Sequence, residues 1–185
     1  MAVTSYHDLE TSTFTRMRAM TLTRIQGKPS WHQLKKLILE CETTALDCTV
    51  KYEWSGQYGL LAEIQEPERY FATTGRQYVA PIEPLNRHPE ILPATTAHRS
   101  AFLTADNDLL KHDWAIVLGF QRAIGLNIRD ALDSRYHNQL KHDVIQYRNV
   151  LPRQYIQHLK TVWVVMDEKI KDELTKNLLR LERPR

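Results

Sequence analysis

Two His-Asp pairs are the residues of this chain best suited to chemistry. They belong to the tripeptides Lys111-His112-Asp113 and Lys141-His142-Asp143, each of which follows a leucine. Imidazole and carboxylate groups bind metal ions and transfer protons near neutral pH. The residues around the two tripeptides otherwise differ, so we interpret both as solvated helix faces. An enzyme that uses His112, His142 and the neighbouring aspartates is the weakest of three functional hypotheses.

Two further motifs look like catalytic or phosphate-binding signatures only superficially. The segment Gly27-Lys28-Pro29-Ser30 ends like a phosphate-binding loop, but Leu22 stands where its first glycine is required. Pro29 also occupies the place of the Ser or Thr that such a loop needs. The segment Thr73-Thr74-Gly75 lacks the aspartate of an aspartic protease, whose mechanism requires two carboxylates. The sequence therefore predicts no enzyme and no cofactor.

The two cysteines, Cys41 and Cys48, are too few for a secreted disulfide framework. They form no Cys-x-x-Cys motif and have no histidine cluster nearby, so we predict buried thiols and no zinc site. No apolar run reaches the roughly 18 residues of a membrane span. Residues 1–5 are neither basic nor apolar, unlike a signal peptide. We expect a cytoplasmic protein.

Basic side chains are concentrated in the C-terminal half. Residues 1–92 carry 10 Lys and Arg against 11 Asp and Glu, whereas residues 93–185 carry 15 against 11. This asymmetry permits contact with a polyanion but does not demand one. The candidate nucleic-acid-binding residues are Arg122, Arg129, Arg135, Lys141, Arg148 and Arg153.

Helical periodicity dominates the elements that must position these groups. The clearest element is a helix over residues 30–46, which Ser30 caps with Gln33 in the capping-box position. Trp31 is expected to pack down on the apolar face of this helix. That face is formed by Leu34, Leu37, Ile38, Cys41 and Ala45.

The middle of the chain is less regular. Residues 50–54 alternate like a short strand, and the apolar run 59–64 fits either a helix or a strand. Pro67 predicts the start of a helix that Gly75 ends. Four prolines within residues 81–93 then indicate a connecting arm.

A long helical pattern follows residue 95, with an apolar stripe through Trp114 and Ile124. Gly119 and Gly125 each weaken this helix by about 1 kcal/mol relative to Ala, so we predict a bend there. A short helix after Asp133, a break over residues 143–151, a helix from Pro152 and a last helix capped by Asp167 complete the pattern.

The predicted fold is mainly α: a bundle of about five to seven helices, with an irregular or short-β segment near residues 14–80. We divide the chain into four parts. These are a disordered tail (1–13), an N-terminal subdomain (14–80), a proline-rich arm (81–94) and a C-terminal helical bundle (95–181).

Several stretches, in matching order, resemble Gag proteins of copia-type LTR retrotransposons, in particular the group found in diatoms and related algae. They are residues 22–30 (LTRIQGKPS), 52–64 (YEWSGQYGLLAEI), 70–75 (YFATTG), 78–81 (YVAP), 147–153 (YRNVLPR), 166–170 (MDEKI) and 173–177 (ELTKN). The resemblance covers about residues 20–180. The chain departs from the family in having Leu151 in place of a capping Ser or Thr, and in carrying no Cys-x-x-Cys-x-x-x-x-His zinc knuckle.

This resemblance implies that the helical bundle is capsid-like. It implies a structural protein whose copies self-associate through helical faces into a shell around RNA. It implies no reaction, no small-molecule substrate and no membrane partner. The alternative is a nucleic-acid-binding helical module that acts without assembly. That module would use the six basic residues as a phosphate-tracking surface, with affinity that falls steeply with salt.

Overall fold

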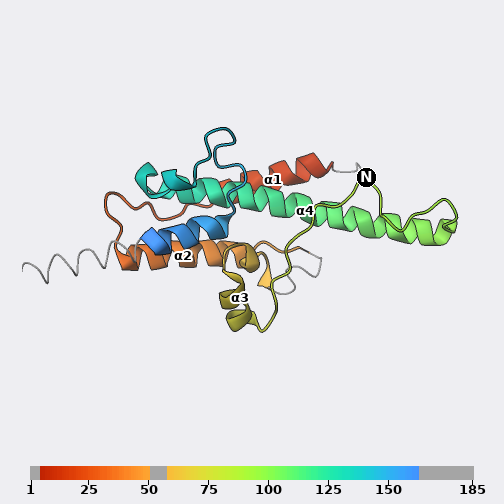
Figure 1. The fold of residues 1–185 in the computed structure, drawn as a ribbon, viewed down its shortest axis with the longest axis horizontal. Coiled ribbons are helices and arrows are strands. Elements are labelled where there is room, and N and C mark those ends of the chain that lie inside the picture. Colours follow the sequence, from red (N-terminus) through yellow and green to blue (C-terminus); the bar gives the residue numbers. More distant parts are fainter. Residues whose placement is uncertain (1–4, 51–57, 163–185) are drawn as a thin grey trace, which may run out of the picture.

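The computed structural model describes residues 5–50 and 58–162, and it is mainly helical (Figure 1). Its longer helices are α1 (Tyr6–Arg18), α2 (Trp31–Leu46), α3 (Pro67–Thr74) and α4 (Ala97–Ala131). Short 3-10 turns are η2 (Leu61–Glu63), η3 (Ser134–Tyr136) and η4 (Asn138–Leu140), and a further helix covers residues 152–162. The predicted mainly α class is confirmed. The predicted strand at 50–54 and the helix after Asp167 lie outside the described residues.

Helix α4 is the axis of the molecule. Figure 1 shows α1 along one side of α4, and α2 with the 152–162 helix along the other. One hydrophobic core joins these elements, with Met17 of α1, Leu37 of α2, Phe120 of α4 and Tyr155 of the 152–162 helix among its buried members. The two predicted subdomains, 14–80 and 95–181, therefore share one core across their described residues.

Helix α1 corrects the prediction of a disordered tail (1–13) for residues 5–13, and residues 1–4 lie outside the described residues. Ser5 and Asp8 form a capping box in which the Asp8 amide donates to Ser5 Oγ at 3.1 Å. Asn127 of α4 is buried, and its Nδ2 donates to the carbonyl oxygens of Met17 (2.9 Å) and Met20 (3.0 Å). A helix of 13 residues is marginal by itself in water. Packing against α4 supplies the stability that the polar sequence of α1 does not predict.

Gly119 has a different role from the predicted one. Helix α4 continues from Ala97 to Ala131 across both glycines. A Cβ built on Gly119 would lie 2.5 Å from the carbonyl oxygen of Glu10 in α1. The missing side chain thus allows α1 to approach α4 closely, a packing requirement that helix propensity does not report.

Locally capped elements agree with the sequence. Ser30 and Gln33 form the predicted capping box of α2, with the Gln33 amide donating to Ser30 Oγ at 3.2 Å. Helix α3 begins at Pro67, and Gly75 ends it with a positive φ of 71°. The helix at 152 follows Leu151, whose amide donates to Gln154 Oε1 at 2.7 Å. That bond is the half of a capping box that the residue three positions after the cap supplies, whereas Leu151 has no side-chain oxygen to supply the other half.

Trp31 does not pack on the apolar face of α2, and 43% of its surface is exposed. It starts a row of residues spaced by four, which continues through Lys35 and Leu39 along the outer side of the helix. Lys35 Nζ lies 5.2 Å from the Trp31 ring centroid. Leu34, three residues further on, takes the buried position instead.

The segment 75–96 contains no helix, as the prolines predict. Part of this arm lies along the N-terminal half of α4, where Asn107 Nδ2 donates to the Leu85 carbonyl at 3.1 Å. Lys111 Nζ donates to the Asn86 carbonyl at 2.8 Å. In the described part of residues 14–80 the non-helical segments are irregular and include no strand.

Candidate nucleic-acid interface

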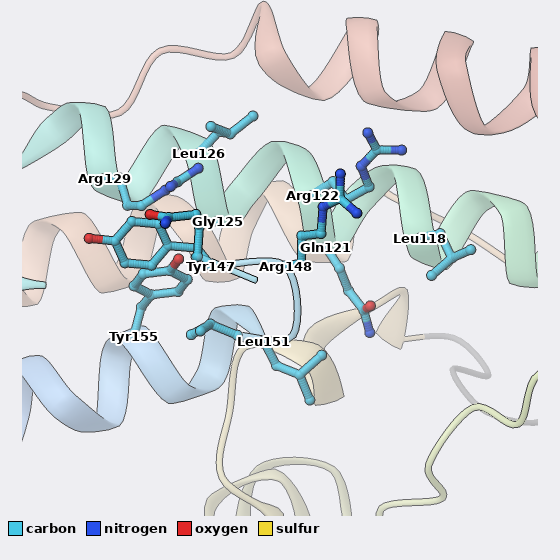
Figure 2. Close-up of a pocket in the computed structure, with 12 residues that line it drawn as sticks. Leu118, Gln121, Arg122, Gly125, Leu126, Arg129, Tyr147, Arg148, Leu151 and Tyr155 are labelled. Carbon is cyan, nitrogen blue, oxygen red and sulfur yellow. The ribbon is translucent and has the colours of Figure 1, made fainter. Parts of the chain in front are cut away.

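A groove of about 540 Å³ lies between α4 and the loop that precedes the 152–162 helix (Figure 2). The loop 143–151 turns back on itself through a bridge between His142 and Gln146, and Gln146 adopts a positive φ of 56°. This turn brings Tyr147 and Arg148 opposite α4. The apolar floor of the groove is formed by Leu118, Gly125, Leu126, Val150 and Leu151.

Three of the six predicted basic residues line this groove: Arg122 and Arg129 from α4, and Arg148 from the loop. Figure 2 shows Arg129 beside Tyr147 at one end of the groove, with Arg122 and Arg148 toward the other. Residues 122 and 129 are seven apart, which is two helical turns, so they share one face of α4. The structure thus brings together half of the predicted set.

The other three predicted residues lie elsewhere. Arg135, in η3, pairs with Asp133 at 3.2 Å and lies over the ring of Tyr136. Lys141 is exposed just after η4. Arg153 is in the first turn of the 152–162 helix, and its guanidinium carbon lies 4.5 Å from the ring centroid of Tyr78. The structure does not place these side chains in the groove.

The three arginines of the groove differ in how they are held. Arg122 pairs with Glu10 of α1, and its side chain remains 65% exposed. The Arg129 guanidinium carbon lies 4.3 Å from the Tyr147 ring centroid, and Arg129 Nε is buried without a hydrogen-bond partner. Arg148 is exposed, and within the described residues its side chain makes no hydrogen bond or ion pair.

Tyr147 is fixed by contacts that occupy its ring and its hydroxyl. The hydroxyl donates to Asn138 Oδ1 at 3.2 Å and lies 3.0 Å from His137 Nδ1. The ring of Tyr155 packs 6.1 Å away, centroid to centroid. Burial, followed by the charge of Arg129, lowers the pKa of His137, so this imidazole is neutral at pH 7. The site charge at neutral pH therefore comes from guanidinium groups.

Guanidinium groups around an apolar floor suit an anionic ligand such as a planar carboxylate or a tetrahedral phosphate. Arginine donates two parallel hydrogen bonds to a phosphate and keeps its charge at any working pH. The ring of Tyr147 is covered by Arg129, and Tyr155 is buried. The groove consequently offers contacts to phosphates more readily than a stacking surface for bases.

The two His-Asp pairs do not form a common site in the described part of the chain. His112 Nδ1 lies 3.0 Å from the carboxylate of its own neighbour, Asp113, which is fully buried rather than solvated as predicted. His142 is in the exposed loop, where its Nδ1 accepts from the Val144 amide at 3.1 Å. Among residues 5–50 and 58–162, no group of three or more His, Cys, Asp or Glu side chains could hold a metal ion.

Both cysteines are buried free thiols, as predicted. Burial, with smaller effects of Glu40 and Glu42, raises the pKa of Cys41 to about 12. Burial also raises the pKa of Cys48, although Arg16 Nη2, 3.8 Å from the sulfur, opposes that shift. Neither thiol is poised to act as a nucleophile.

Sequence reasoning missed a buried carboxylate beside the groove. Glu63 of η2 is 2% exposed, and Gln121 of α4 donates to its Oε2 at 2.8 Å. Tyr78 donates to the other oxygen at 3.4 Å. These residues are far apart in sequence and have no shared periodicity, so no local signal could have grouped them.

No helix in the described ranges combines the length and the apolar character that crossing a membrane requires. No family model, no curated protein and no solved structure matches the chain. Two observations therefore bear on function. One is the resemblance of its sequence segments to one family, and the other is the geometry of its surfaces.

Proposed function

We propose that this chain is a Gag-like structural protein that self-associates in the cytoplasm into a capsid-like shell around RNA, and that it catalyses no reaction. The segments in matching order over about residues 20–180 support this proposal. So does the mainly helical fold, which is the class that the resemblance implies.

A segment with many exposed apolar side chains is the observation that carries the self-association proposal. Figure 1 shows the N-terminal end of α4 extending past the ends of α1 and α2, with the chain that precedes it alongside. Five large apolar side chains on residues 79–102 are 52–73% exposed: Val79, Ile82, Leu85, Leu92 and Phe102. We call these five residues the apolar arm.

Such a number of exposed apolar groups within residues 79–102 favours contact with another protein surface. Burying apolar area stabilises an association by roughly 25 cal/mol per Å². Isolated exposed apolar residues are normal on a protein, whereas a group of them marks an interaction site or a risk of aggregation. Contacts between unlike faces of identical subunits build rings or open polymers.

The test is light scattering coupled to size-exclusion chromatography, over a tenfold concentration range, with and without RNA. Self-association predicts a mass that grows with concentration. The double variant Leu85→Ser/Leu92→Ser is expected to reduce that growth. Val144→Ser is the matched control, because Val144 is 82% exposed on a loop away from the arm. A strict monomer in every condition would contradict the proposal.

One alternative has its own support: a nucleic-acid-binding helical module that acts without assembly. The groove with Arg122, Arg129 and Arg148 favours it. The same measurement separates the two proposals. A protein that binds RNA but stays monomeric at every concentration fits the module and not the shell.

A further inference from the structure

We infer that the groove between α4 and the 143–151 loop binds phosphates of a single-stranded RNA backbone, and that Glu10 of α1 competes with the RNA for one of its three arginines. Arg129 and Arg148 make the resting phosphate contacts, and Arg122 is recruited when it leaves Glu10. The inference rests on the RNA partner in the proposed function and assigns that contact to one site.

Arg148 is the most accessible of the three. It lies in an exposed loop, and within the described residues its side chain has no partner. Its guanidinium lines the same groove as that of Arg129. A guanidinium without a carboxylate of its own, in a groove that two other arginines line, attracts anions.

Arg129 is preorganised. Its guanidinium lies over the ring of Tyr147, and that ring is in turn held through the bond from its hydroxyl to Asn138. The Nε of Arg129 is buried and has no hydrogen-bond partner. Because Nε is shielded from solvent, an incoming phosphate contacts the outer Nη groups of Arg129, which lines the groove.

Arg122 is the arginine for which Glu10 and the RNA compete. It forms an ion pair with Glu10 and lies 5.7 Å from the ring centroid of Phe14, both in α1. Because the Arg122 side chain is 65% exposed, this pair is accessible to solvent and to salt. An RNA phosphate that enters the groove meets Arg122 on the open side and can replace the Glu10 carboxylate.

The shape of the groove favours a flexible single strand with little sequence preference. The groove is a cleft of about 540 Å³ between a helix and a loop, too small to admit a duplex. Its aromatic rings are engaged or buried, so bases have no stacking surface there. Contacts limited to phosphates carry no sequence information.

The salt dependence of binding measures how many phosphates are contacted. Each contact to a single strand contributes about −0.7 to the slope of log K against log salt. Anisotropy of a short labelled oligouridine, from about 50 to about 300 mM salt, is expected to give a slope contribution near −1.4 from Arg129 and Arg148. Arg148→Gln should reduce this slope contribution to about −0.7 and weaken binding several-fold. Glu10→Gln should strengthen binding and steepen the slope contribution to about −2.1, because Arg122 then joins the other two arginines.

Arg99→Gln is the matched control, because Arg99 is an exposed arginine at the far end of α4 that also pairs with a glutamate, Glu90. Circular dichroism checks folding, which Arg148→Gln should leave unchanged. If Arg148→Gln and Arg99→Gln bind alike, or if Glu10→Gln does not strengthen binding, the inference is overturned. Tripolyphosphate is the competitor, added at the same concentration of phosphate groups as the oligouridine. If it displaces the oligouridine, the groove binds small phosphate compounds and the RNA assignment is overturned.

The same titration on Leu85→Ser/Leu92→Ser separates this inference from the assembly proposal. Unchanged affinity in that double variant supports a groove that binds RNA independently of self-association. Binding that is lost together with assembly would overturn the groove as the site.

Discussion

Gly119 of α4 faces the carbonyl oxygen of Glu10 in α1 so closely that an added Cβ would lie 2.5 Å from that oxygen. The same Cβ would lie 3.0 Å from the Cβ of Thr13 and 3.1 Å from the amide nitrogen of Phe14. Two of these three neighbours are backbone atoms, which cannot rotate away. The approach of α1 to α4 thus depends on the absence of a side chain at one position.

Gly119→Ala is therefore expected to destabilise the protein by roughly 1–3 kcal/mol, the usual cost of overpacking. Urea unfolding followed by circular dichroism measures it. Gly125→Ala is the control in the same helix, because its Cβ would meet only the ring of Tyr155 at 3.4 Å. That change should be nearly neutral, because the helix propensity of Ala, about 1 kcal/mol better than that of Gly, offsets the contact with Tyr155. Equal effects of the two substitutions would contradict the close-approach account.

Glu63 predicts an unusual pH dependence. Burial raises its pKa from the ordinary 4.5, although Gln121, Arg153 and Tyr78 oppose that shift. The folded state therefore holds this proton more tightly than the unfolded state. The stability due to Glu63 is fully present below pH 4.5 and is lost as the pH rises through the folded pKa.

Glu63→Gln removes this titration. The free energy of unfolding of the wild type, minus that of the variant, should increase as the pH is lowered from 7 toward 4.5. Urea titrations at several pH values measure this difference, in which the effects of other carboxyl groups cancel. A difference that decreases on acidification would mean that the interactions with Gln121 and Arg153 outweigh burial.

The native thiols are expected to resist modification by thiol reagents. With a pKa of about 12, about one Cys41 side chain in ten thousand is a thiolate at pH 8. Ellman's reagent should label Cys41 only after denaturation, and Cys48 should react first because Arg16 favours its thiolate. Leu39→Cys supplies a positive control at a position that is 62% exposed. Rapid labelling of both native thiols would show that the core opens readily.

Ser30→Ala should cost about 1 kcal/mol of stability, because the Gln33 amide loses its acceptor at the start of α2. Thermal unfolding measures the loss. Ser12→Ala is the control, since Ser12 is exposed in the interior of α1, where alanine is a better helix former. A loss as large for Ser12 would indicate that serine hydroxyls matter for reasons other than capping.

Sequence alone predicted the elements whose ends are determined by neighbouring residues. The capping box of Ser30 and Gln33, the start of α3 at Pro67 and its end at Gly75 all agree with the structure. Capping bonds and φ preferences act within a few residues, so they are present in the local sequence. The stripe of α4 was predicted for the same reason, because its apolar residues repeat at helical spacing.

Tertiary structure decided what depends on contacts between distant segments. Helix α1 is stable where α4 packs against it, and its polar sequence gave no sign of that partner. Three of the six predicted basic residues line one groove, because the turn at residues 142–146 brings Arg148 opposite the helix that carries Arg122 and Arg129. Charge and residue type can be read along a chain, whereas the direction in which a loop returns depends on the core against which it packs.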